Sequence, residues 1–247
     1  MSAVAIQPTR PPLPRLTTVE LRKSIDTRAG FWLLCLVALS VLAVVVLVLA
    51  VGKAEDQTFA SLFGDTIGVA SIFLPIVGLL LVTSEWSQRT ALTTFTLVPE
   101  RSRVIVAKLL AGCALALAAV VLCLALAAAG NVIGGGSWDF QLSHLYEAAL
   151  YELFGMLGAL ALGLLIMHSA AAIVTYFVLP TVVGIVVEVV SALHGPAKWF
   201  EPNQVTTPLA EGTIHGSGWA HFAVTFGVWV VLPLVAGMLR LRRHELK

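Results

Sequence analysis

The feature that most constrains this chain is the length of its uncharged apolar runs. Residues 31–51 contain no charged side chain, and neither do the 35 residues from Leu153 to Val187. About 20 consecutive apolar residues are enough to cross the hydrocarbon core of a bilayer as an α-helix. Only 12% of the 247 residues are charged, against about 25% in soluble domains. The sequence therefore predicts an all-α membrane protein without a large soluble domain.

The apolar runs divide into six predicted membrane spans. One helix over Leu153 to Val187 would be about 52 Å long, well over the ~30 Å hydrocarbon core, so we divide that run at His168. The six spans form a predicted transmembrane domain over 30–241, and a cytoplasmic tail follows at 242–247. Their predicted bounds are about 30–51, 66–83, 105–130, 146–167, 170–190 and 218–239. Within the third span, we expect a face of small residues to pack against another helix: Ala111, Gly112, Ala114 and Ala118.

The distribution of basic residues predicts the orientation. An even number of spans places both termini on one side. The N-terminal segment, the 84–108 segment and the C-terminal tail hold thirteen of the fifteen Lys and Arg residues, whereas the other side has only Lys53 and Lys198. Loops rich in Lys and Arg stay in the cytoplasm, so both termini and the 84–108 segment are predicted to be cytoplasmic.

The N-terminal residues predict a retained segment that lies on the membrane. Residues 1–15 are rich in proline and are expected to be disordered. About 29 residues precede the first apolar run, which differs from a cleavable signal peptide. Thr17 and Glu20 have the spacing of a helix capping box. Residues 16–29 then alternate apolar side chains with cations such as Arg22 and Lys23, a pattern typical of an interfacial amphipathic helix.

The most polar interior stretch, TSEWSQRTALTTFTLVPERSRVIVAK, lies at 83–108. Leu92, Phe95 and Val98 recur every third residue, which indicates a short amphipathic helix that ends before Pro99. An ordinary positively charged loop is the alternative on pattern alone. A short amphipathic helix on the cytoplasmic side would suit a docking surface for a partner protein.

This segment resembles the first intracellular loop of ABC-2-type permeases. Such loops contain Glu, an aromatic residue, Thr, a short Thr/Leu-rich helix, Pro, two arginines and then Lys at the next span. The matching residues here are Glu85, Trp86, Thr90, Pro99, Arg101, Arg103 and Lys108, whereas Arg89 stands where the family often has Gly. Glu20, Arg22 and Lys23, in ELRK before the first span, are similar to the elbow helix of the family. The short helices of the family before its last span correspond to residues 191–217.

The resemblance implies the permease subunit of an ATP-driven ABC exporter that moves an apolar or amphipathic small molecule, drug, peptide or lipid outward. Its cytoplasmic coupling helix would dock on one of two ATPase subunits, and a second permease, identical or paralogous, would complete a dimer. The chain has no GxxxxGK(S/T) phosphate loop, so ATP and Mg²⁺ are expected to be used by the partner ATPase and no cofactor is expected on this chain. The residues implied in ATPase coupling are Glu85, Trp86, Arg89, Thr90, Leu92, Phe95, Pro99, Arg101 and Arg103.

Four acids lie near the predicted outer ends of spans: Asp65, Glu147, Glu152 and Glu188. Charges are costly at the bilayer centre, so solvated end charges are the favoured interpretation. The functional alternative is an outer lining of the translocation path, for which Glu152 and Glu188 are the candidates.

Other classes of function have less support in the sequence. Neither the Cys nor the His spacing resembles a metal site, and no nucleophile-plus-base arrangement or paired acids indicate an intramembrane enzyme. A membrane scaffold or sensor that recruits a cytoplasmic partner through the same loop is the alternative. The expected location is a bacterial cytoplasmic membrane, with membrane lipids and no nucleic acid among the partners.

Overall fold

The computed structural model describes residues 11–52, 58–87 and 101–243. Over these residues the chain is helical, apart from short connections and one isolated bridge between Thr58 and Ser137. The helices are α1 (Leu13–Asp26), α2 (Arg28–Val51), α3 (Phe59–Ser87), α5 (Arg101–Gly134), α6 (Leu142–Ile166), α7 (Ser169–Val189), α8 (His194–Ala197), α9 (Pro202–Ala210), α10 (Gly218–Phe226) and α11 (Leu232–Arg243). A 3-10 turn, Ser191–Leu193, precedes α8, and a π-helical turn, Gly227–Val231, joins α10 to α11.

Among the described residues, six helical runs are long and apolar enough to cross a membrane: α2, α3, α5, α6, α7 and the continuous run from α10 to α11. Each overlaps one predicted span in chain order, which fits the predicted multi-pass helical membrane protein. The largest differences from the predicted bounds are in α3, which begins at Phe59, and in α5, which occupies 101–134. The predicted bounds followed the apolar residues alone. Because Lys and Arg are good helix formers, α5 already begins at Arg101 and includes Arg103 and Lys108.

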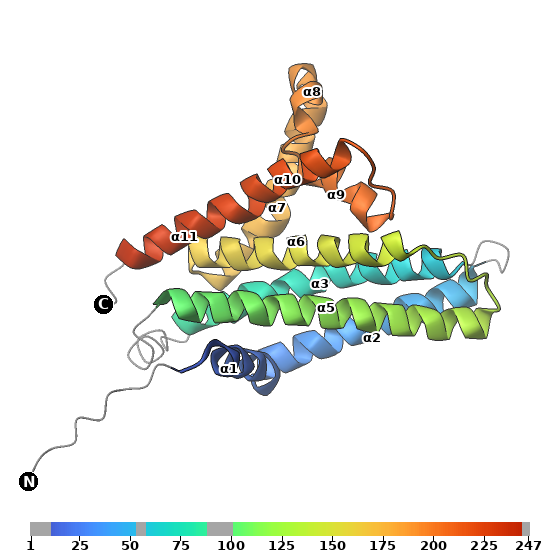
Figure 1. The fold of residues 1–247 in the computed structure, drawn as a ribbon, viewed down its shortest axis with the longest axis horizontal. Helices are drawn as coiled ribbons and strands as arrows, with labels where there is room; N and C mark the ends of the chain where they lie inside the picture. The colour runs from blue at the N-terminus through green and yellow to red at the C-terminus, as the bar shows by residue number, and fades with distance from the viewer. Residues whose placement is uncertain (1–10, 53–57, 88–100, 244–247) are drawn as a thin grey trace, which may run out of the picture.

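The long helices form a bundle from which α7 departs. In Figure 1, α2, α3, α5 and α6 run alongside one another, and α1 lies across the bundle near the first residues of α2. Helices α7 and α8 point away from this bundle, and α11 slants over α6. The last residues of α3 and α11 lie at the same end of the bundle as α1 and the first residues of α5.

Helix α5 packs through a face of small residues, but not the predicted one. Ala111 and Gly112 are buried, as predicted, whereas Ala114 and Ala118 are exposed. Ala116 and Ala119 are buried instead, because a helix of 3.6 residues per turn returns to one face after three or four positions. A Cβ added to Gly112 would lie 2.5 Å from Leu160 Cδ1 of α6. The glycine therefore permits the close approach of α5 and α6.

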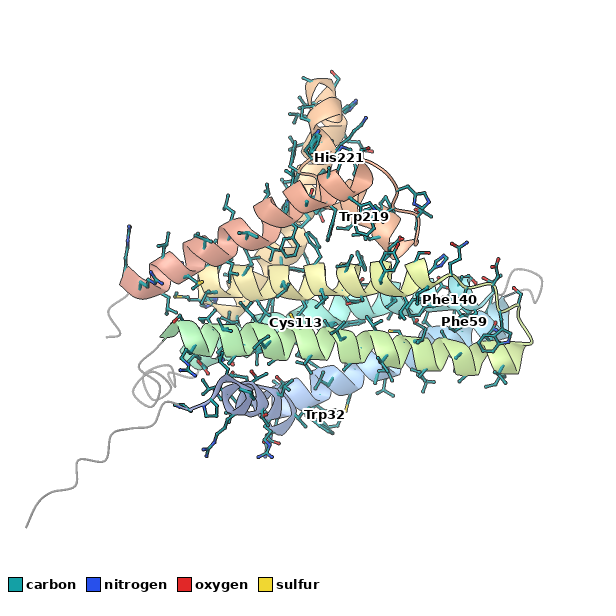
Figure 2. All side chains as sticks on the ribbon, viewed as in Figure 1. Trp32, Phe59, Cys113, Phe140, Trp219 and His221 are labelled. Atoms are coloured by element: carbon teal, nitrogen blue, oxygen red, sulfur yellow. The ribbon has the colours of Figure 1, made fainter. Side chains whose placement is uncertain are left out.

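An aromatic cluster closes the opposite end of the bundle. The ring of Phe59 lies 4.8 Å from that of Phe140 and 5.1 Å from that of Trp138, between ring centroids, and Phe59 and Phe140 lie together in Figure 2. The Phe59 backbone N–H also donates to the Ser137 carbonyl over 2.9 Å. These contacts fix the first turn of α3 against the connection between α5 and α6.

The N-terminal helix differs from its prediction at its start. Helix α1 begins at Leu13, inside the segment predicted to be disordered, and Pro12 is its N-cap. Proline is favoured in the first helical turn because its ring fixes φ and that turn needs no amide donors, and Pro14 lies there. The predicted capping box is wrong, since the Thr17 hydroxyl donates to the Leu13 carbonyl within the helix.

The connection over 191–217 contains the short helices α8 and α9, in agreement with the expectation from the resemblance. Glu201 is buried and caps α9, because its carboxylate accepts hydrogen bonds from the N–H groups of Asn203 and Gln204 at 3.1 and 2.6 Å. A carboxylate at this position also complements the positive end of the helix dipole.

Candidate functional site

Four charged side chains from three helices meet at the end of the bundle where α1 lies. The Lys108 ammonium of α5 donates to Glu20 Oε2 of α1 at 2.6 Å and to Glu85 Oε1 of α3 at 3.0 Å. Lys23 of α1 donates to Glu20 Oε1 at 2.7 Å and to Glu85 Oε1 at 2.8 Å. We call these four residues the charge cluster. It alternates two acids and two bases, so its formal charge is zero.

Local helix geometry places each member. Glu20 and Lys23 are three residues apart on α1 and so project from one face of it. Glu85 lies in the last turn of α3, and Lys108 lies in the third turn of α5. The Lys108 ammonium also donates to the Leu81 carbonyl at 2.9 Å. All three of its N–H donors therefore have acceptors.

Three of the four cluster members are almost free of solvent. Lys108 is 1% exposed, Glu20 4% and Glu85 5%. Removing such charges from water costs several kcal/mol per ion, which only close pairing and hydrogen bonding recover. Removal of any one member would leave a buried charge with fewer partners. The contact between the three helices therefore requires charges of these signs at these positions.

Lys23 is the most accessible member, with 39% of its side chain exposed. Burial alone would lower the pKa of its ammonium. The hydrogen bonds to Glu20 and Glu85, together with the charges of both carboxylates, have the larger combined effect and raise the pKa above its ordinary value of 10.5. Lys23 is therefore protonated throughout the physiological range, and the cluster does not titrate through this residue near neutral pH.

The cluster connects α1 to both helices that flank residues 88–100. Helix α3 ends at Ser87 and α5 begins at Arg101. A further contact lies nearby, because Arg103 Nη2 donates to the Pro11 carbonyl at 2.9 Å. A displacement of the last turn of α3 or the first turns of α5 would therefore displace α1, and a displacement of α1 would displace those helix ends.

The predicted coupling and elbow residues lie in different surroundings. Glu85, Glu20 and Lys23 belong to the charge cluster, and Arg103 contacts the residue two positions before α1. Trp86 is partly buried against the core, and Arg22 is exposed on α1. Arg101 begins α5. The remaining coupling residues lie outside the described residues: Arg89, Thr90, Leu92, Phe95 and Pro99.

The two residues predicted for a translocation path lie in different surroundings. Glu188 is exposed near the end of α7. Glu152 is 1% exposed on α6, and its Oε1 has no hydrogen-bond partner among the described residues.

Glu147 is also buried, and its Oε2 accepts from the Ile214 N–H at 3.3 Å. The favoured interpretation of Glu147 and Glu152 as solvated end charges is therefore wrong, because both side chains are buried. For Asp65, which is exposed on α3, that interpretation agrees with the structure.

Lys108 matches the family loop but was not among the predicted coupling residues, although it lies at the centre of the cluster. The available signal was its position, four residues inside the predicted third span at 105–130, where a cation needs a buried partner. The partner could not be identified, since Glu20 lies 88 residues away in the sequence. Glu201 was missed for a different reason, because an acid in a loop carries no signal of burial, although the amides that it caps are only two and three residues away.

Comparisons with known proteins do not assign the chain to a family. No protein-family model matches the chain, and no curated protein matches it. Among the described residues, no group of three or more His, Cys, Asp or Glu side chains is placed to hold a metal ion.

Proposed function

We propose that this chain is the transmembrane subunit of an ATP-driven exporter of the ABC-2 type, moving an apolar or amphipathic compound outward. The observation that carries the proposal is the charge cluster. It ties α1, the proposed elbow helix, to the ends of α3 and α5, the two helices that lead into and out of the proposed ATPase-docking segment.

A docking segment can drive transport only if its movement also displaces the membrane-spanning helices. Packed helices behave as elements with discrete arrangements rather than as continuously deformable material. The ion pairs of Lys108 with Glu20 and Glu85 join the three helix ends at 2.6 and 3.0 Å. Movement of residues 88–100 would then shift α1, α3 and α5 together, which is the mechanical behaviour that the proposal requires.

The proposal assigns the chemistry of ATP to the partner. Two ATPase subunits would bind and hydrolyse ATP with Mg²⁺, and a second permease would complete the transport path. The chain would reside in a bacterial cytoplasmic membrane with both termini in the cytoplasm, as its basic residues indicate. Glu152 would offer a polar contact on the path, because a buried carboxyl oxygen without a hydrogen-bond partner is free to accept one.

The test is association with the ATPase after changes to the proposed docking helix. Leu92→Asp and Phe95→Asp place a charge on its apolar face, and Thr18→Asp, at an exposed position of α1, is the matched control. We expect each docking variant to weaken co-purification of an ATPase by at least about tenfold, since losing one apolar anchor costs about 2 kcal/mol or more. The control should leave it unchanged.

Retention of the ATPase by both docking variants, in protein with an unaltered unfolding midpoint, would contradict the coupling assignment. A partner protein without a nucleotide site, released by the same two changes, would instead favour the scaffold or sensor alternative.

A further inference from the structure

A groove of about 830 Å³ opens beside the charge cluster. Its walls come from α1, the first turns of α2, the last turns of α3, the first turns of α5 and the start of α7. The cluster forms one end of the groove, since Glu20, Lys23, Glu85 and Lys108 all line it.

The lining of the groove combines apolar and hydroxyl-bearing side chains. The apolar side chains include Leu33 of α2 and Val77, Leu80 and Leu81 of α3. The side chains with a hydroxyl group belong to Ser24, Thr27, Ser84, Ser87 and Ser169. An occupant with a hydrocarbon part and a polar head matches this lining, because apolar surface is more favourable against hydrocarbon than against water.

The groove carries an excess of positive charge. Its lining has three bases, Lys23, Arg28 and Lys108, and two acids, Glu20 and Glu85. All three N–H donors of Lys108 already have acceptors, in Glu20, Glu85 and the Leu81 carbonyl. Lys23 uses two of its three N–H donors there. Arg28 is exposed, and no ion pair to it is found among the described residues.

The groove lies at the level expected for lipid headgroups. Thr27 to Gly30 line it at the start of the apolar helix α2. Two residues further on, Trp32 is 68% exposed, and in Figure 2 its ring projects from the bundle beside α1. Exposed tryptophan at the end of a membrane span is typical of the interface between hydrocarbon and water.

We propose that this groove binds an anionic phospholipid of the surrounding bilayer. Its phosphate would lie at Lys23 and Arg28, and one acyl chain would lie along Leu33, Val77 and Leu80. The phosphate accepts charge-assisted hydrogen bonds from Lys, Arg and hydroxyl groups. The lipid would thereby contact α1, α2 and α3 at once. The inference rests on the groove and the membrane character of the chain, and it is independent of the exporter proposal.

The test compares lipid retention by the purified full-length chain in detergent. The chain is stripped of lipid, titrated with phosphatidylglycerol or phosphatidylcholine, and the lipid-bound fraction is measured by native mass spectrometry. We expect phosphatidylglycerol to bind more tightly than phosphatidylcholine. Arg28→Gln should weaken its binding at least about tenfold, the effect of one charged hydrogen bond. Arg22→Gln is the matched control, because Arg22 is also exposed but does not line the groove.

A second variant tests occupancy of the groove without changing charge. Ser84→Phe, at a lining position of the groove, should obstruct it and reduce phosphatidylglycerol binding, and the unfolding midpoint reports whether the variant folds. If it does not fold, the Arg28→Gln comparison still decides, since Arg28 is exposed and its replacement disturbs no buried contact.

Three results would overturn the proposal. Equal loss in Arg28→Gln and Arg22→Gln would indicate a diffuse surface effect. Equal binding of the two lipids would remove the role of charge. Displacement of phosphatidylglycerol by glycerol 3-phosphate at similar concentration would identify a soluble phosphate ligand rather than a bilayer lipid.

Discussion

At the scale of single residues, the account depends on Lys108. Its ammonium donates to three acceptors on two other helices: Glu20 of α1, and Glu85 and the Leu81 carbonyl of α3. It is among the largest fully buried side chains described in the chain. A lysine in this position stabilises the fold only while its acids remain, since the pairing offsets a large desolvation cost.

Lys108→Met should therefore lower the free energy of unfolding by about 3–5 kcal/mol, because it leaves two buried carboxylates with Lys23 as their remaining cation. Arg22→Met, which removes an exposed cation from α1, should change it by no more than about 0.5 kcal/mol. Equilibrium unfolding in mixed micelles measures both. Similar values for the two variants would show that the cluster contributes little to the fold.

Residue roles were harder to predict from the sequence than helix positions. The family resemblance selected Glu20 and Lys23 as elbow residues and Glu85 as a coupling residue, and these roles stay predictions; the structure places all three in the charge cluster. The contact of Lys23 with Glu85 was not predicted, because the two residues lie 62 positions apart in the sequence. The burial of Glu147 was missed for a related reason, since its partner Ile214 lies 67 residues further along the chain.

At the scale of helices, α1 is held to the bundle by ion pairs as well as by apolar contacts. Leu21 of α1 packs against the core, and Glu20 and Ser24 are buried. Lys23 lies at the accessible edge of this contact, so its protonation state affects α1 directly.

The raised pKa of Lys23 predicts how the attachment of α1 depends on pH. Because the folded pKa lies above the ordinary 10.5, this contribution to stability is complete below that pH. It is lost as the pH rises through the folded pKa. Lys23→Arg should retain the charge, because arginine stays protonated there.

The difference in unfolding midpoint between the wild type and Lys23→Arg should thus be constant up to about pH 10 and then grow in favour of the variant. Thermal scans in detergent across that range measure it. Other titrating groups are common to both proteins and cancel in the difference. A difference that is constant to about pH 12 would show that Lys23 is not held by the two carboxylates.

Helix positions were the most predictable level of the structure, because the apolar windows are long and uninterrupted. Helix ends were less predictable, as α3 and α5 show, since a helix continues past its apolar window wherever its residues favour it. The buried face of α5 was predicted only in part, because alanine on a lipid-facing surface looks like alanine in a helix contact. The structure separates the two kinds, with Ala116 buried and Ala118 exposed.

At the scale of the whole molecule, one end of the bundle gathers the features of the proposed function. The helix α1, the ends of α3 and α11 and the start of α5 lie together there (Figure 1). We propose that this end faces the cytoplasm, because the N-terminal segment, the 84–108 segment and the tail hold most of the basic residues. The aromatic cluster around Phe59 and Phe140 closes the other end (Figure 2). The two ends are thus chemically distinct, as a protein with a fixed orientation in the membrane requires.

The measurement that tests the central proposal most directly is the mass and composition of the native complex. The chain would be purified from its own host in mild detergent and weighed intact by native mass spectrometry. The account predicts two permease chains with two ATPase subunits, and loss of the ATPase subunits when Leu92 and Phe95 are both replaced by Asp. A chain recovered alone, or with a partner that has no nucleotide-binding site, would contradict the exporter assignment.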